Sequence, residues 1–509
     1  MPSSVPVSVK PNKKDNNLMK RVLSIAALAV LLLSCGHKGA YKIPGVGSFD
    51  ALVYTTTADS TRLFVKSGLD FAAADPSVPV IRVTDQTFQT VEGFGAAITV
   101  SSCYNLLKMK LEDRKAFLVE LFDPKEGVGS SLIRLAIGGS DFTWDYEHPN
   151  GGRFTWCDEE GMEHFAPHEL DVKYVLPILK EIYAINPDVK IIGSPWTAPR
   201  WMKLDADLKE PHYSWTGGRL NPACYQDYAD YFVKWIQYFE GQGFPIYSIT
   251  PQNEPLNAGN SMSMLMYWED TRDFVKTALG PAFEKAGLKT KILIFDHNYN
   301  YDRMADQDGY PLKVYEDPEA SKYIAGSAWH NYGGRVSELD RIIAAAPDKE
   351  IWFTEASIGK WGYRFGRSLL NDFREIFLGT LSRNGKGVVF WNLMLDEKFG
   401  PYTNFKGSCM TCYGAVNVVS GDYSKVDRYS QWYNIAHASV VVRPEAVRVG
   451  TEGSVEGVQC LVFRNVDGSY GALLLNDADA AKQLSLTAGK HSLPVEVPSR
   501  SLVSVRWTE

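Results

Sequence analysis

Eight short apolar runs alternate with amphipathic stretches through the middle of the chain, and this alternation constrains the fold more than any other feature. The runs cover residues 91–99, 131–137, 189–194, 246–252, 291–296, 326–331, 350–354 and 387–392. Short apolar runs separated by helical stretches are typical of the strands of a parallel sheet. Eight such units predict an α/β fold, a (β/α)8 TIM barrel over residues 86–435.

One of the intervening helices can be placed in detail. Asn221 is a favourable cap, and Pro222 suits the first helical position. Four aromatic residues then follow at helical spacing before Gly241 ends the stretch: Tyr228, Phe232, Trp235 and Phe239. This spacing predicts that the four rings face the core and do not bind sugar.

The segments on either side of the barrel have the sequence pattern of antiparallel strands. Residues 458–464 and 470–475 predict a hairpin closed by an Asp-Gly turn, and residues 484–486, 495–497 and 502–507 predict further strands. Residues 52–56 and 62–65 predict two strands before the barrel. We expect residues 49–85 to join residues 436–509 in an accessory β-sandwich, so that the chain enters and leaves through one domain.

The N-terminus carries the pattern of an export signal. Two basic residues precede an apolar run over residues 22–33, which Ser-Cys35-Gly follows. The run is shorter than the roughly 20 residues that span a bilayer, as expected for a signal peptide. The segment around Cys35 resembles a bacterial lipobox. We therefore expect residues 1–35 to be a lipoprotein signal peptide, residues 36–48 a tether, and the protein an exported, membrane-anchored lipoprotein of the bacterial cell envelope. A plain signal peptide with an incidental cysteine is the alternative.

Composition and motifs exclude several classes of function. The net charge of −7 and the absence of a basic patch beyond the N-terminus argue against a nucleic-acid partner. The sequence contains neither a His-Glu-x-x-His zinc motif nor a P-loop. Cys409 and Cys412 lack the second cysteine pair of a structural zinc site, so a local disulfide or two free thiols are both open. We expect no metal and no cofactor.

Two glutamates stand at the ends of predicted barrel strands. Glu254 follows the fourth run and Glu355 ends the seventh. Barrel enzymes carry their chemistry at this end of the strands. Hydrolysis of a glycosidic bond needs one carboxyl to protonate the leaving oxygen and another on the opposite face. A single glutamate there would be read as a solvated loop charge, but the pair predicts catalysis.

These glutamates and their surroundings resemble clan A of the glycoside hydrolases. The order of the other motifs is similar to glycoside hydrolase family 30, which includes glucosylceramidases and β-1,6-glucanases. The similar segments begin at Gln89, Ile133 and Ser194, and continue with Asn253-Glu254-Pro255, Asp296-His-Asn298, Trp329-His330-x-Tyr332 and Trp391-Asn392-Leu393. The resemblance implies that Glu254 is the acid/base and Glu355 the nucleophile of a retaining β-glycosidase.

The resemblance also implies a subsite for the sugar whose bond is cleaved, the −1 subsite. Its residues would be Arg134, Asp141, Trp196, Asn253, His330, Tyr332 and Trp391. Indole rings suit the apolar face of a sugar, and Asp and Asn suit its hydroxyls. An arginine beside the nucleophile would keep it ionised. Arg134 could instead be a buried ion-pair partner, Trp391 a core residue, and His330 a structural hydrogen-bond donor.

The segment after the eighth run departs from the family pattern. Many relatives have Gly-Gly-Pro-Asn where this chain has residues 398–404, and residues 407–414 are more similar to the β-1,6-glucanase branch. We therefore expect hydrolysis of β-1,6-glucan. Glucosylceramidase, β-glucosidase, β-xylosidase or β-fucosidase activity is the alternative, but a ceramide would need an exposed apolar rim, which these loops do not suggest. A non-catalytic, glycan-binding surface lipoprotein is the alternative of another class.

Overall fold

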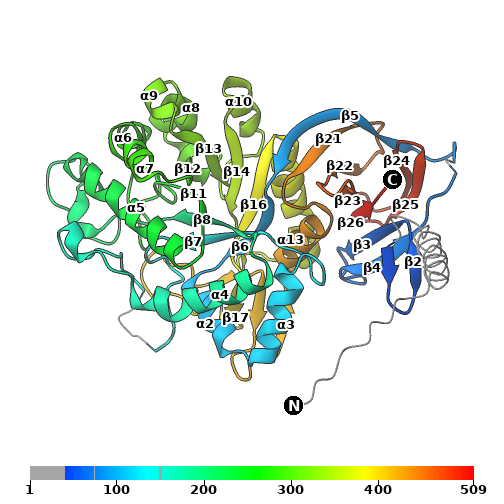
Figure 1. Ribbon diagram of the computed structural model, residues 1–509, viewed down its shortest axis with the longest axis horizontal. Coiled ribbons are helices and arrows are strands. Elements are labelled where there is room, and N and C mark those ends of the chain that lie inside the picture. Colours follow the sequence, from blue (N-terminus) through cyan, green and yellow to red (C-terminus); the bar gives the residue numbers. More distant parts are fainter. Residues whose placement is uncertain (1–40, 74, 148–151) are drawn as a thin grey trace, which may run out of the picture.

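The computed structural model describes residues 41–73, 75–147 and 152–509. A barrel and a β-domain lie side by side, with the barrel on the left of Figure 1. The predicted signal peptide and Cys35 lie outside the described residues. Within the described residues, no helix has both the length and the apolar character needed to cross a membrane.

All eight predicted barrel strands are present. They are parallel and close in the order β11-β12-β13-β14-β16-β6-β7-β8. The strands are β6 (Gly93–Ala97), β7 (Leu132–Ala136), β8 (Lys190–Ser194), β11 (Ile246–Ile249), β12 (Lys291–Asn298), β13 (Ile324–His330), β14 (Glu350–Glu355) and β16 (Gly385–Asn392). The helices around them are α2 (Val100–Lys108), α3 (Leu111–Phe122), α4 (Leu176–Ile185), α5 (Tyr225–Gly241), α6 (Trp268–Phe274), α7 (Gly280–Ala286), α8 (Tyr310–Tyr315), α9 (Pro318–Ser321), α10 (Glu338–Ala345), α11 (Phe365–Asp372) and α12 (Gly379–Ser382). The predicted barrel is confirmed.

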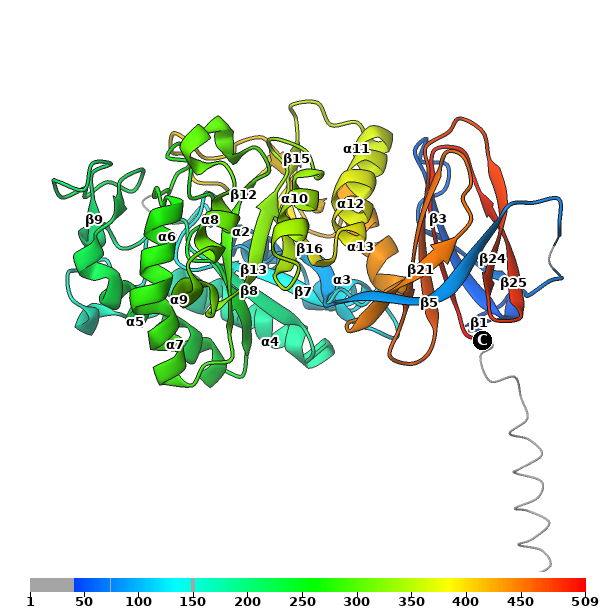
Figure 2. The same ribbon diagram turned by 90° about the horizontal axis from the view of Figure 1, so that it is seen from above.

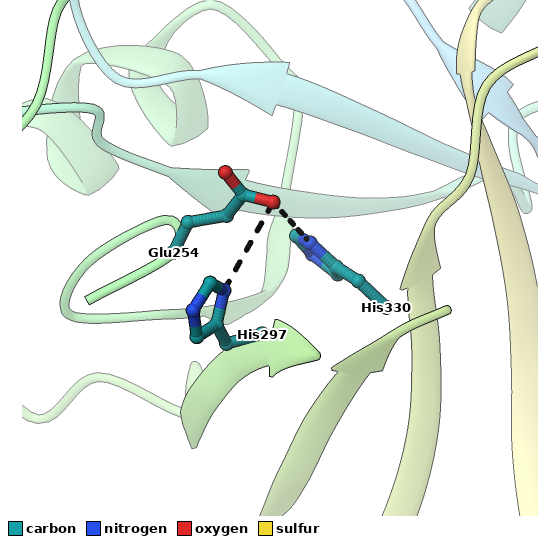
Figure 3. Close-up of side chains that lie close together, drawn as sticks. All are labelled: Glu254, His297 and His330. Atoms are coloured by element: carbon teal, nitrogen blue, oxygen red, sulfur yellow. Dashed lines mark hydrogen bonds and ion pairs between the residues drawn. The ribbon is translucent and has the colours of Figure 1, made fainter. Parts of the chain in front are cut away.

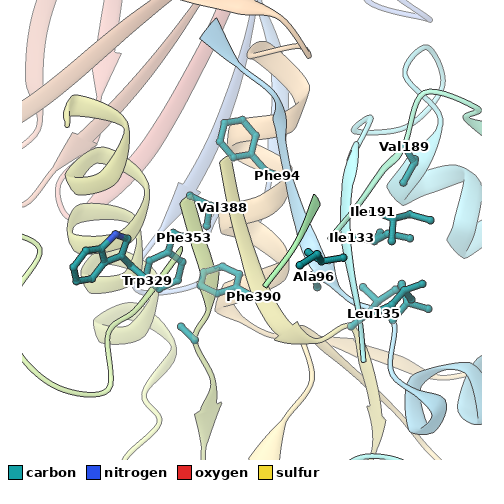
Figure 4. Packing of buried hydrophobic residues seen from close by; sticks show 14 of the residues in the cluster. Phe94, Ala96, Ile133, Leu135, Val189, Ile191, Trp329, Phe353, Val388 and Phe390 are labelled. Carbon is teal, nitrogen blue, oxygen red and sulfur yellow. The ribbon is translucent and has the colours of Figure 1, made fainter. Parts of the chain in front are cut away.

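Alternation along the strands separates the barrel interior from the helix-facing layer. On β7, Ile133 and Leu135 join the cluster beneath the helices, as Phe94 and Phe390 do on neighbouring strands (Figure 4). The residues between them point inward. One layer of the interior is apolar: Leu132, Ile192, Leu293, Ala328, Trp352 and Val389. Two residues further along three of these strands lie Arg134, Ser194 and Thr354, so the interior becomes polar towards the carboxyl ends.

The helix predicted after Asn221 is confirmed as α5. The Asn221 side chain accepts a hydrogen bond from the Ala223 amide, and a short 3-10 turn (Pro222–Cys224) leads into the helix. The four predicted aromatics are buried at 2 % exposure or less: Tyr228, Phe232, Trp235 and Phe239. They are core residues, as their spacing predicts.

The β-domain is formed by both ends of the chain, as predicted. One nine-stranded sheet has the order β25-β24-β5-β21-β22-β23-β26-β3-β4. Its strands are β3 (Ala51–Thr57), β4 (Val65–Leu69), β5 (Val80–Val91), β21 (Ala446–Glu452), β22 (Val458–Arg464), β23 (Tyr470–Asn476), β24 (Lys482–Ala488), β25 (His491–Val497) and β26 (Ser501–Trp507). Figure 2 shows β5 running from this domain to the barrel. The predicted barrel limits at residues 86 and 435 fall inside β5 and inside helix α13 (Ser430–Val441).

Two local predictions need correction. The strand expected over residues 62–65 begins at Val65, because Phe64 has a left-handed φ of 52° that breaks the extended backbone. The expected tether is folded in its described part: β1 (Tyr41–Ile43) and β2 (Gly47–Phe49) form a hairpin that turns at Gly45, with φ 75°. The Tyr41 hydroxyl lies 3.0 Å from the Thr508 hydroxyl, so the hairpin is tied to the C-terminus.

Candidate active site

A cavity of about 430 Å³ opens at the carboxyl ends of the barrel strands and contains both predicted glutamates. The strands therefore bring together Glu254 and Glu355, which are about a hundred residues apart in the sequence. The residues around the cavity are Asp141, Trp196, Glu254, Asn257, Asn260, Asn298, Tyr332, Glu355, Ser357, Trp361, Trp391, Gly407, Ser408, Cys409 and Cys412.

Glu355 is held by one cation and one hydroxyl. Its Oε2 accepts from Arg134 Nη1 at 2.5 Å, and its Oε1 accepts from the Tyr332 hydroxyl at 3.0 Å. Burial raises the pKa of Glu355, while the charges of His330 and Arg134 oppose that rise. The fixed guanidinium therefore favours the ionised carboxylate that a nucleophile requires.

Asp296 links these groups beneath the cavity. Its Oδ2 accepts from Arg134 Nη2 at 2.8 Å, and its Oδ1 accepts from the Thr354 hydroxyl at 2.6 Å and faces His330 Nε2 at 3.0 Å. Burial would raise the pKa of Asp296, but Arg134 and His330 hold it well below its usual value. A left-handed φ of 52° at Asp296, with a register shift between β12 and β13, turns the carboxylate inward.

Glu254 lies just beyond β11, with a left-handed φ of 47°. Its amide donates to the Asp296 carbonyl at 3.0 Å. Its Oε2 accepts from the side-chain amides of Asn257 at 2.9 Å and Asn260 at 2.5 Å. Burial would raise the pKa of Glu254, but the hydrogen bond with His330 and the charges of His297 and His330 outweigh it and lower the pKa to about 2.

His330 lies between two carboxylates, and Figure 3 shows its ring directed at Glu254. Nδ1 is 3.3 Å from Glu254 Oε1, and Nε2 is 3.0 Å from Asp296 Oδ1. Because both neighbours are acceptors, the ring bonds to both only as an imidazolium. Burial alone would lower the pKa of His330, but the charge of Glu355 and the bonds to Asp296 and Glu254 raise it to about 9.

Glu254, His297 and His330 also have the spacing of a metal-binding set. Their candidate ligand atoms all lie within 4.8 Å of one another. Metal binding requires a neutral imidazole, whereas His330 is held in its protonated form by the carboxylates on either side. A proton therefore competes directly with any cation for this position.

Two tryptophans form an aromatic corner in the cavity. The rings of Trp196 and Trp391 stack with centroids 4.9 Å apart, and the Arg134 guanidinium carbon lies 5.1 and 5.5 Å from them. This corner offers an apolar surface beside Glu355, which suits the C–H face of a sugar.

Asp141 is enclosed by protein apart from the cavity itself. Burial raises its pKa to about 8, although the Cys409 amide, which donates to it at 3.1 Å, acts in the opposite direction. Cys409 and Cys412 form a disulfide, which decides between the two states that the sequence leaves open. The bridged segment therefore helps to hold the Asp141 carboxyl at the wall of the cavity.

Six of the nine predicted site residues border the cavity: Asp141, Trp196, Glu254, Tyr332, Glu355 and Trp391. The resemblance places Arg134, Asn253 and His330 there too, but these buried residues lie behind the cavity. Arg134 and His330 contact its carboxylates, and Asn253 contacts Arg134. Asn253 Oδ1 accepts from Arg134 Nη2 at 2.7 Å.

Sequence reasoning assigned no role to Asp296, Asn257 or Asn260. Asp296 stands at a strand end, so the strand-end argument used for the two glutamates could have found it. Nothing in the pattern around Asn257 and Asn260 indicates that they approach Glu254.

Two large apolar side chains near the mouth of the cavity are exposed. Trp361, which borders the cavity, is 58 % exposed, and Met410, between the two bridged cysteines, is 48 % exposed. Single exposed apolar side chains are ordinary on protein surfaces, so the expectation that the loops after β16 present no apolar rim stays a prediction.

Comparison with known proteins gives one consistent result. Residues 91–442 match the glycosyl hydrolase family 30 TIM-barrel domain, and residues 445–505 match the family 30 β-sandwich domain. An endo-1,6-beta-D-glucanase of Aspergillus fumigatus is 28 % identical over 76 % of this chain and 78 % of its own length. A putative glucosylceramidase of Caenorhabditis elegans is 28 % identical over 85 % of this chain and 83 % of its own. The solved structure of the endo-beta1,6-glucanase BT3312 is 49 % identical, with a TM-score of 0.86 over 90 % of this chain and 99 % of its own.

Proposed function

Because this chain belongs to glycosyl hydrolase family 30, we propose that it cleaves β-1,6-linked glucan by a retaining double displacement. The observation that carries the proposal is the pair of opposed carboxyls, Glu254 and Glu355, in one cavity. A surface protein that only binds glycans needs no such pair, so the non-catalytic alternative is disfavoured.

In the first step, Glu355 attacks the anomeric carbon while the glycosidic oxygen takes a proton from Glu254. Arg134 and Tyr332 hold the attacking carboxylate in one orientation. Before this step His330 holds the proton. Glu254, whose Oε1 lies 3.3 Å from His330 Nδ1, passes it to the glycosidic oxygen. The bond to the leaving sugar breaks, and a glycosyl ester forms on Glu355.

In the second step, water attacks the ester and regenerates Glu355. Glu254 takes a proton from that water, and His330 holds the proton again when the cycle closes. Asn257 and Asn260 keep the Glu254 carboxylate in place through both steps by bonding the same oxygen. Two inversions at the anomeric carbon retain its β configuration.

Support for a β-1,6-linked substrate comes from the relatives and from the wall of the cavity. BT3312, at 49 % identity, is described as an endo-β-1,6-glucanase. The disulfide segment narrows the mouth beside Asp141. A 1,6-linkage has an extra rotatable bond, so such a chain can bend into a walled cavity. Digestion of β-1,6-, β-1,3- and β-1,4-glucans with product analysis tests this, and a preference for the 1,4-linked chain would contradict it.

Glucosylceramide is the second candidate substrate. The exposed Trp361, which borders the cavity, could contact a lipid chain. A comparison of kcat/KM on glucosylceramide in detergent with kcat/KM on β-1,6-glucan decides between them, and a clear preference for the lipid would reject the glucan.

We further propose that the protein is exported and anchored through an acylated Cys35. The basic pair, the short apolar run and the lipobox-like segment support this. Mass spectrometry of the mature N-terminus from membrane fractions tests it. A soluble protein that begins at an unmodified residue downstream would reject the anchor.

A further inference from the structure

We propose that Trp361 is the platform for the first sugar on the leaving-group side, the +1 subsite, and that it stacks on a β-1,6-linked glucosyl unit. This inference rests on the proposed function, because it takes the leaving group to be a sugar. Nothing in the sequence pattern around Trp361 marks it as a binding residue.

Trp361 is unusual in its exposure. All thirteen tryptophans of the chain are among the described residues, and Trp361 is the one that is classed as exposed, at 58 %. It nevertheless borders the same cavity as Glu254 and Glu355. A large ring left in water at the mouth of an active site is typical of a binding surface.

The exposed ring is held in place by its neighbours. Strand β15 (Ile358–Gly359) pairs with β18 (Cys412–Tyr413), and the Lys360 amide donates to the Thr411 carbonyl at 3.0 Å. The indole lies over Gly359, where a Cβ would be 2.1 Å from the Trp361 ring. The platform is therefore joined to the disulfide segment and preformed, which lowers the entropy cost of binding.

The surrounding loops decide which way the substrate can extend. The β14 loop with Trp361 adjoins the β16 loop at Thr411. That loop reaches the β11 loop, because a Cβ on Gly407 would be 2.1 Å from the Gly259 carbonyl oxygen. The wall thus runs from Trp361 round to Asn260. Over β12 and β13 the cavity is bordered by Asn298 and by Tyr332, which is 47 % exposed.

Glu254, the proton donor, follows β11, which is the neighbour of β12 in the barrel. The leaving sugar must lie on the side of the group that protonates its oxygen. In the proposal it lies between Glu254 and Trp361, which border the same cavity, with its apolar face against the indole. The extra bond of a 1,6-linkage lets the leaving sugar rotate until that face meets the ring.

Two substrates separate this role from a general effect on the site. A β-1,6-linked glucotetraose places a sugar at +1, whereas β-glucosyl fluoride leaves that position empty. Trp361→Ala should lower kcat/KM on the tetraose about 30-fold, the scale of removing a strong aromatic contact, and leave the fluoride nearly unchanged. Trp361→Phe should recover part of the loss, because a smaller aromatic face remains.

Tyr213→Ala is the matched control, since Tyr213 is 63 % exposed but does not border the cavity. It should leave both substrates unchanged. Equal losses on tetraose and fluoride in Trp361→Ala, or no loss on either, would overturn the platform while the proposed function stands. A wild-type enzyme that hydrolyses the fluoride but not the tetraose would overturn the proposed substrate and the platform together.

Discussion

The floor of the cavity and its rim are built from different interactions. The floor, comprising Arg134, Glu254, Asp296, His330 and Glu355, is buried and tied together by ion pairs. The rim, comprising Trp361 and residues 407–412, is more exposed, although Cys412 is buried, and it is held by short strand pairing and a disulfide.

The difference has a functional meaning. The floor groups compensate one another's charge, so removal of one leaves an uncompensated buried charge. A change in the rim affects one contact with the leaving group. We therefore expect floor variants to impair the chemical steps themselves, and rim variants to impair only substrates that contact the rim.

The largest effect should follow removal of the nucleophile. Glu355→Ala should lower kcat on every glycoside by roughly 10⁴- to 10⁶-fold, as when a catalytic nucleophile is deleted. A 2-deoxy-2-fluoro-glucoside with a good leaving group should label Glu355 in the wild type, located by peptide mass spectrometry. Glu240→Gln, at the exposed end of α5, is the control. A label on another residue would contradict the assignment.

The next effect should depend on the leaving group. Glu254→Ala should lower kcat/KM on glucan by about 10²- to 10⁴-fold, because its poor leaving group needs a proton. Activated aryl glucosides should lose far less, and added azide should yield a β-glucosyl azide. Equal losses on both substrates without azide rescue would reject the acid/base role.

The third prediction concerns pH and the Glu254–His330 pair. Activity should fall as the pH rises through about 9, where His330 loses its proton. In His330→Asn, Glu254 no longer has the imidazolium that depresses its pKa, so it must hold the proton itself. The alkaline limb of the pH profile of kcat/KM should then move to lower pH. If it does not move, the hypothesis that Glu254 and His330 share the catalytic proton is contradicted.

The same proton contributes to stability. The pKa of His330 in the folded protein is raised to about 9, above the ordinary histidine value of 6.5, so the contribution is fully present below pH 6.5 and is lost as the pH rises through about 9. Thermal unfolding of wild type and His330→Asn across this range checks the sign. The difference between the two proteins should shrink at the alkaline end.

The smallest effect should come from the rim disulfide. Replacing Cys409 and Cys412 by Ser should lower glucan turnover several-fold and leave small aryl glucosides almost unchanged, because it loosens the segment that holds Asp141. Because the disulfide closes a very short loop, it contributes about 2 kcal/mol at most to the free energy of unfolding. The Tm of the double variant should therefore fall only modestly. A large loss of activity on both substrates would show that the disulfide supports the catalytic residues of the floor and not only the leaving-group contacts of the rim.

Much of the floor could be predicted from the sequence, for a physical reason. Glu355 follows from its place at a strand end. Arg134 is placed at the site by the family resemblance, and alternation on the strand agrees with it, because Arg134 points inward as Leu132 does. Asp296 also stands at a strand end, so the same argument could have found it, but with a left-handed φ of 52° its inward direction does not follow from regular alternation. Periodicity carries no information where the strand is irregular.

The rim and the tether could not be predicted in the same way. Trp361 and Met410 lie in loops, where spacing says nothing about exposure. The hairpin at Tyr41–Phe49 is short, and its stability depends on contacts with the far end of the chain, such as that with Thr508. The sequence of the hairpin itself does not indicate which distant residues will contact it, so its folding could not be predicted.

The composition of the nine-stranded sheet also has a consequence for how the protein is made. Strand β3 pairs with β26, with Ala51 opposite Trp507. This strand is synthesised early, but it can pair with β26 only after almost the whole chain has been made. Such distant pairing makes folding slow. The barrel's first strand, β6, follows directly on β5, which also belongs to that sheet. A nascent chain can therefore assemble most of its barrel while the nine-stranded sheet is incomplete, and a loss of the last ten residues would remove β26 and leave β3 paired only with β4.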